Sequence, residues 1–124
     1  MGKKVIFFLS LRFEVNTDAG FQVASCPALN IHEAAETEQA AIGHLIEHVD
    51  LVLSTAKEEG TFWDLLDHYE LLKPESKNHR AQMIPASMEK PSRPQDLQTH
   101  WIDRPIPVEL LSGNPPGGLT GHGN

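Results

Sequence analysis

One short segment of the chain has the residue spacing of a metal-binding helix. His44 and His48 lie four residues apart, and Glu47 precedes the second histidine, which matches the H-x-x-E-H pattern of inverted zinc proteases. On a helix the two imidazoles would lie one turn apart, and the carboxylate could act as a base. The sequence offers no evident third ligand and no large scaffold, so a solvated helix face is the favoured interpretation. We predict no catalytic residue, no metal site and no cofactor, and weak metal binding by the two histidines stays open.

Carboxylates and the single cysteine are the other residues of the chain that could support catalysis. A two-metal nuclease needs several carboxylates that converge at strand ends. Glu14 and Glu33 could both lie on the polar face of a sheet and Glu36 begins a helix, but nothing in their spacing gathers them. Cys26 precedes Pro27 at a strand end, with no helix N-terminus or basic neighbour to lower its pKa. Solvated carboxylates and a buried structural thiol are the favoured interpretations.

The composition is that of one acidic globular domain. The chain has 124 residues, of which 40% are hydrophobic and 22% charged, and a net charge of -7. This charge argues against tight binding to bare nucleic acid, which needs clustered Lys and Arg, and it suits a basic protein partner. One cysteine fits a reducing cytoplasm. Charged residues return soon after the apolar N-terminal run, so we expect no cleaved signal, no membrane span and a cytoplasmic location.

Three strands are expected in the first part of the chain. Every odd position from residue 5 to 15 is apolar, which predicts a strand over about residues 4–15 with one buried face. Residues 16–20 contain Asn, Asp and Gly and are expected to form a hairpin loop. A second strand is predicted over residues 21–26, ended by Pro27. A third is predicted over about residues 31–36.

Two helices are expected next. Thr37 is a suitable N-cap for a helix whose apolar residues repeat at intervals of three and four, and Gly60 is a suitable C-cap. The apolar face of this helix can lie across the three strands. Thr61 restarts the helical pattern, which continues to about Lys73.

The composition changes at Pro74, because eight of the nine prolines lie from there onward. We therefore expect residues 74–124 to form a proline- and glycine-rich extension that is flexible apart from one short edge strand. Residues 106–111 are the preferred candidate for that strand, since proline is tolerated at a sheet edge. Residues 81–85 are a less favoured candidate.

Residues 5–59 resemble the HicB-like antitoxin fold, which is the N-terminal domain of HicB proteins. Three segments carry the resemblance: the hairpin turn Asp18-Ala19-Gly20-Phe21, the Pro–x–Leu step Cys26-Pro27-Ala28-Leu29, and the helix entry Ala35-Glu36-Thr37-Glu38-Gln39-Ala40-Ala41, with Ala35 in place of the usual Gly. The resemblance covers under half of the chain. It implies an α+β, β-β-β-α-(β) two-layer fold over residues 1–73. In that fold a three- to four-stranded, antiparallel-rich sheet carries one long helix and lacks nuclease carboxylates.

The same resemblance implies a function and a place for the fourth strand. HicB-like antitoxins bind and neutralise a small basic toxin ribonuclease of the HicA type. Family members typically add a ribbon-helix-helix or helix-turn-helix domain, which residues 74–124 do not resemble, so DNA binding by this chain alone is not expected. The fourth strand of the fold follows the helix. If residues 106–111 form it, residues 61–105 are an insertion that holds the second helix.

Three apolar residues are expected to face away from the core. Ile6 and Phe8 lie on the face of the first strand opposite its apolar set, and Leu51 lies opposite the apolar stripe of the long helix. This sheet face is expected to be covered by an interface or by the second helix, through Phe62, Trp63, Leu66 and Tyr69. The predicted partner-binding residues are Ile6, Phe8, Glu47, Asp50 and Leu51. Two alternatives stay open: a metal-dependent nuclease or hydrolase, and a homo-oligomeric structural domain.

Overall fold

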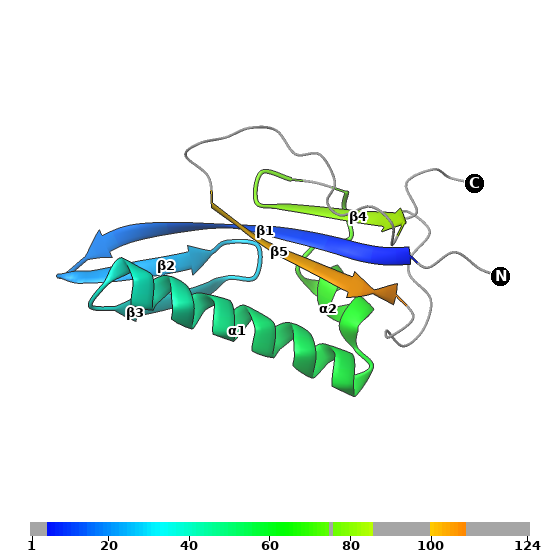
Figure 1. Cartoon of the computed structure of the whole chain (residues 1–124), viewed down its shortest axis with the longest axis horizontal. Helices are drawn as coiled ribbons and strands as arrows, with labels where there is room; N and C mark the ends of the chain where they lie inside the picture. Colours follow the sequence, from blue (N-terminus) through cyan, green and yellow to red (C-terminus); the bar gives the residue numbers. More distant parts are fainter. Residues whose placement is uncertain (1–4, 75, 86–99, 109–124) are drawn as a thin grey trace.

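Five strands form one antiparallel sheet against which two helices pack, as shown in Figure 1. The structure is a computed structural model that describes residues 5–74, 76–85 and 100–108. Its elements are β1 (Val5–Asp18), β2 (Phe21–Cys26), β3 (Ile31–Ala35), α1 (Glu38–Glu59), α2 (Phe62–His68), β4 (His79–Pro85) and β5 (His100–Pro107). The predicted α+β class, with one long helix on an antiparallel sheet, is confirmed.

Strand β1 is the centre of the sheet. It pairs with β2 through residues 14–18, with β4 through residues 5–11 and with β5 through residues 6–13. Because β4 and β5 pair with the same stretch of β1, they occupy its two opposite edges. Strand β3 pairs with β2 and completes the order β3-β2-β1-β4, with β5 as a branch from β1.

The β1–β2 hairpin is tighter than the sequence predicts. Asn16 and Thr17 belong to β1, and the loop contains only Ala19 and Gly20. Both loop residues have positive φ angles, 51° and 86°, as in the type I′ turn whose twist matches that of the flanking strands. The expectation of a five-residue loop was wrong because polar turn-forming residues also fit an exposed end of a strand ladder.

Helix α1 begins and ends where its capping residues predict. The Thr37 hydroxyl accepts a hydrogen bond from the Ala40 backbone N–H at 3.1 Å. At the other end Gly60 has a φ angle of 74°, and the Thr61 N–H donates to the Ala56 carbonyl at 2.9 Å. This is a Schellman ending, and it turns the chain sharply into α2.

The core lies between the sheet and the helices. It combines the odd-numbered side chains of β1 with one stripe of α1; the buried members are Phe7, Leu9, Leu11, Phe13, Ala41, Leu45, Val49, Leu53 and Ala56. Phe62 and Leu66 of α2 belong to the same cluster. The period-2 and period-3.6 patterns of the sequence therefore identify the two surfaces that meet.

Helix α2 differs from its prediction in length and in position. It ends at His68, where Glu70 takes a φ angle of 60° and the Leu71 N–H donates to the Leu66 carbonyl at 2.7 Å. The rings of Phe62 and Trp63 contact Phe7, at centroid distances of 5.8 and 5.3 Å, and so lie on the α1 side of the sheet. They do not cover the Phe8 face, because the short Gly60–Thr61 junction keeps α2 on the same side as α1.

The described part of the C-terminal region contains two strands, where one was expected. The less favoured candidate lies within β4, and β5 begins at His100, before the preferred candidate at residues 106–111. Residues 109–111 lie outside the described part of the chain. Residues 61–105 are thus no simple insertion, since β4 and most of β5 lie within them. Both strands pair with β1, and the sheet extends beyond residue 73.

Candidate partner-binding surface

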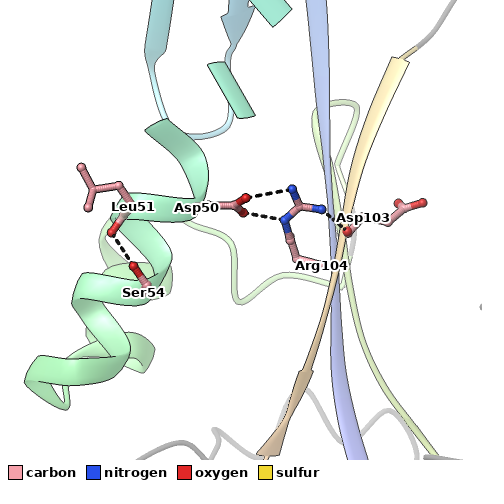
Figure 2. Close-up of polar contacts among 5 residues, drawn as sticks. All are labelled: Asp50, Leu51, Ser54, Asp103 and Arg104. Atoms are coloured by element: carbon pink, nitrogen blue, oxygen red, sulfur yellow. Dashed lines mark hydrogen bonds and ion pairs between the residues drawn. The ribbon is translucent and has the colours of Figure 1, made fainter. Parts of the chain in front are cut away.

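The outward face of α1 carries an exposed apolar side chain among charged ones. Leu51 is 63% exposed, more than any other large apolar side chain in the described residues. Glu47 lies one helical turn before it and is also exposed. Figure 2 shows the Leu51 side chain extending away from the strands. This face of α1 was predicted to bind a partner, and it offers both an apolar contact and negative charge.

A groove lies beside Leu51, between α1 and α2. Its volume is about 370 Å³, and its lining residues are His48, Leu51, Val52, Thr55, Ala56, Glu59, Thr61 and Leu65. The groove exists because the Gly60 turn brings α2 back beside the last turns of α1. Its apolar walls come from both helices, and Glu59 places a carboxylate at its rim. The pattern of α1 alone does not predict this groove, since Leu65 of α2 and Thr61 before that helix also line it.

Asp50 is held within the chain. Its carboxylate accepts two hydrogen bonds from Arg104 of β5, from Nε at 2.6 Å and from Nη2 at 3.1 Å, as Figure 2 shows. Arg104 also donates through Nη1 to the Asp103 carbonyl at 2.8 Å. The bidentate pair fixes the guanidinium and ties the middle of α1 to β5. A partner that used Asp50 would have to displace Arg104, and so Asp50 is the weaker of the two predicted acidic contacts.

The predicted apolar residues of β1 belong to a different part of the molecule. Phe8 is only 4% exposed and Ile6 is half-buried, so Phe8 offers little surface to a partner in the described chain. Ile6 lies between Ile84 and Pro107 on the neighbouring strands. Because side chains alternate along a strand, Ile6 and Phe8 face away from the Phe7 side on which the helices pack. The structure therefore joins Glu47 and Leu51 in one surface and leaves the two β1 residues out of it.

One member of the α1 histidine pair, His48, contacts the sheet. Nδ1 of His48 lies 2.7 Å from Oε2 of Glu33 on β3, which fastens the helix to the sheet edge. Within residues 5–74, 76–85 and 100–108, no three His, Cys, Asp or Glu side chains are grouped to hold a metal ion. Glu14 pairs with Ser25 and Glu33 with Ala24, so these two carboxylates lie on opposite faces of the sheet. The two carboxylates therefore do not share one polar face.

A Ser–His pair near α2 was not anticipated from the sequence. His79 is buried; its Nδ1 lies 2.8 Å from the Ser76 hydroxyl and its Nε2 lies 2.8 Å from the Lys73 carbonyl. Since a carbonyl only accepts, Nε2 carries a proton, and in the neutral ring Nδ1 accepts from the Ser76 hydroxyl. The pair borders a cavity of about 210 Å³. The Ser76 oxygen also accepts from the Asn78 N–H at 3.1 Å, so these bonds together fasten the turn before β4. The sequence contains one indication of this position: His79 precedes the apolar Ala81 by two residues, and residues two apart on a strand share a face. His79 thus occupies the inward face of β4.

Cys26 is buried at the end of β2. Burial raises the pKa of its thiol above the ordinary value, and the backbone hydrogen bonds from Leu29 and Ala28 act in the opposite direction. A thiol in this environment is a poor nucleophile near neutral pH. The predicted structural thiol is confirmed as a buried one.

Comparisons of the chain with protein-family models, with curated proteins and with solved structures each give no match. The surface of the chain itself is therefore the basis for inferring its function. In the described part of the chain, neither helix has the length and apolar character needed to cross a membrane.

Proposed function

We propose that this chain is a cytoplasmic protein-binding module of the antitoxin type. It neutralises a small basic toxin ribonuclease by covering the toxin's RNA-binding or active face. The observation that carries the proposal is the outward face of α1, where Leu51 is 63% exposed beside the carboxylate of Glu47. An exposed apolar side chain with charged side chains around it is a common form of anchor in protein contacts.

The charge of the surface indicates the kind of partner. Glu47, Glu58 and Glu59 are all exposed on α1, and the chain as a whole has a net charge of -7. Such a surface accelerates encounter with a basic protein and opposes binding to nucleic acid. A ribonuclease toxin must itself be basic where it holds RNA, so an acidic cover over that face blocks the substrate.

The order of elements also supports the proposal. The HicB-like resemblance implies three strands, a long helix and a further strand, and the described chain has β1, β2, β3 and α1, followed by α2, β4 and β5. The turn at Ala19–Gly20 and the turn after Cys26 lie at the positions on which that resemblance depends.

The test is co-expression of the chain with the small basic proteins encoded in neighbouring open reading frames. We expect one of them to be toxic alone, and to be harmless and stoichiometrically bound in the presence of this chain. Leu51→Glu should weaken the complex by about tenfold or more, because it removes an apolar anchor while keeping good helix propensity.

Phe21→Glu is the matched control, since Phe21 is 48% exposed but lies at the hairpin, away from α1. This variant should bind as the unmodified chain does. Recovery of the chain alone, or as a homo-oligomer insensitive to Leu51→Glu, would contradict the proposed function.

A further inference from the structure

The groove between α1 and α2 extends the exposed surface of α1 into a concave site. Leu51 forms one lip, Val52 and Leu65 supply apolar walls, and the exposed carboxylate of Glu59 lies at the rim. A concave apolar site with a few polar groups at its edge is the usual form of a pocket that takes one anchoring side chain. Its volume of about 370 Å³ leaves room for a large apolar side chain.

The charges around the groove select among the possible occupants. A second copy of the chain would bring another -7 net charge and another row of α1 carboxylates against Glu58 and Glu59. Like charges brought together at an interface oppose association. A segment that carries Lys or Arg next to its apolar residue would instead complement the rim.

We propose that the α1–α2 groove binds one apolar side chain of a basic partner protein, with flanking Lys or Arg side chains of the partner pairing with Glu59 and Glu47. This inference rests on the proposed function, because it names the part of the basic partner that α1 recognises. It adds a binding site formed by two helices, to which Val52, Thr55 and Leu65 contribute and for which α1 alone is not sufficient.

The direct test uses three short synthetic peptides of equal length. The first has lysines around one central leucine, the second has alanine in place of that leucine, and the third has glutamates in place of the lysines. Methyl NMR spectra of the full chain report binding at Leu51, Val52 and Leu65. We expect the lysine–leucine peptide to shift these three sets of signals in a saturable way, and the other two peptides to shift them weakly. Equal binding of the glutamate peptide, or shifts confined to other residues, would overturn the inference.

Two variants locate the site. Thr55 is exposed and lines the groove, so Thr55→Trp should fill the groove and lower affinity for the lysine–leucine peptide by about tenfold or more. Glu59→Lys should weaken the same peptide several-fold, with a smaller effect at high salt. Glu36→Lys is the control, because it changes the net charge equally at an exposed position beyond the other end of α1.

The same variants and peptides test the groove assignment and the antitoxin role independently. If a complex with a basic toxin forms and is unaffected by Thr55→Trp, the groove assignment fails and the antitoxin role stands. If the lysine–leucine peptide binds in the groove but no basic toxin is recovered in co-expression, the antitoxin role fails and the groove assignment stands.

Discussion

The thiol of Cys26 lies among buried side chains of β2 and of the turn that follows it. Its pKa is raised above the ordinary value of 9.0, chiefly because burial disfavours the thiolate. Between the ordinary pKa and the higher pKa of the folded state, the unfolded chain loses the thiol proton while the folded chain keeps it. The free energy of unfolding must therefore fall as pH rises above about 9.

Urea unfolding of the chain and of Cys26→Ala, measured from pH 7 to pH 10, checks this expectation. The substitution lowers stability at every pH, because it removes a buried side chain. The difference between the two curves should shrink above pH 9, since only the unmodified chain loses the contribution of the buried thiol. Two curves that stay parallel through pH 10 would contradict it.

Contacts distinguish residues that the sequence presents as equivalent. Glu47 and Asp50 are both acidic residues on the polar side of α1, yet only Asp50 meets an arginine, 54 positions away in the chain. Alternation along β1 correctly predicts that Phe7 and Phe8 face opposite sides. It cannot predict that Phe8 is buried, because burial of the second face depends on segments far away in sequence.

At the level of elements, α2 ends in a strained residue. Glu70 has a φ angle of 60° at a Schellman-type ending, where glycine is the usual residue. Its ion pair with Lys73 is exposed and contributes little. Glu70→Gly should raise the free energy of unfolding by about 0.5–1 kcal/mol, because removing Cβ relieves the left-handed strain by more than the added entropy of the unfolded chain costs.

Thermal and urea unfolding of Glu70→Gly and Glu70→Ala measure this effect. Both variants lose the Lys73 contact, but only glycine relieves the backbone strain. Alanine should therefore leave stability unchanged or slightly lower. A glycine variant no more stable than the alanine variant would show that the α2 ending is not strained.

The elements that the sequence predicts well are those fixed by local signals. The caps at Thr37 and Gly60, the alternation of β1 and the stripe of α1 each depend on residues a few positions apart. The strands after Pro74 were predicted poorly because their position depends on pairing with β1. Residues 79–85 and 100–107 contain prolines, which led to the prediction of a loop-like extension. In β4 and β5 these prolines occupy positions that are compatible with a sheet. The groove was missed for a similar reason, since it depends on the angle between two helices.

At the scale of the whole molecule, a surface ion pair between α1 and β5 joins the helix layer to the sheet in addition to the core. Asp50 of α1 and Arg104 of β5 form a bidentate contact, but both side chains are partly exposed. Exposed pairs contribute about 0–1 kcal/mol. We therefore expect a double-mutant cycle of Asp50→Ala and Arg104→Ala to give a coupling energy of about 0.5–1 kcal/mol that decreases with added salt.

Urea unfolding monitored by far-ultraviolet circular dichroism and by tryptophan fluorescence would measure this coupling. The transitions of all variants should remain single and coincident, because the buried cluster shared by the sheet and both helices holds the layers together. A coupling energy above about 2 kcal/mol would show that the ion pair, and not the core, joins α1 to β5.

The central position of β1 has a consequence for the synthesis of the protein. β1 is made before β4 and β5, which pair with its two edges and begin at His79 and His100. In a nascent chain that ends between α2 and β4, the strand partners of residues 5–11 have not yet been made. The apolar residues of β1 then lie on a strand whose backbone N–H and C=O groups lack their β4 and β5 partners. Such strands pair readily with other chains. Folding of the first half of the chain on the ribosome is therefore expected to stop at an association-prone stage, and chaperones that shield extended apolar segments would act during that interval.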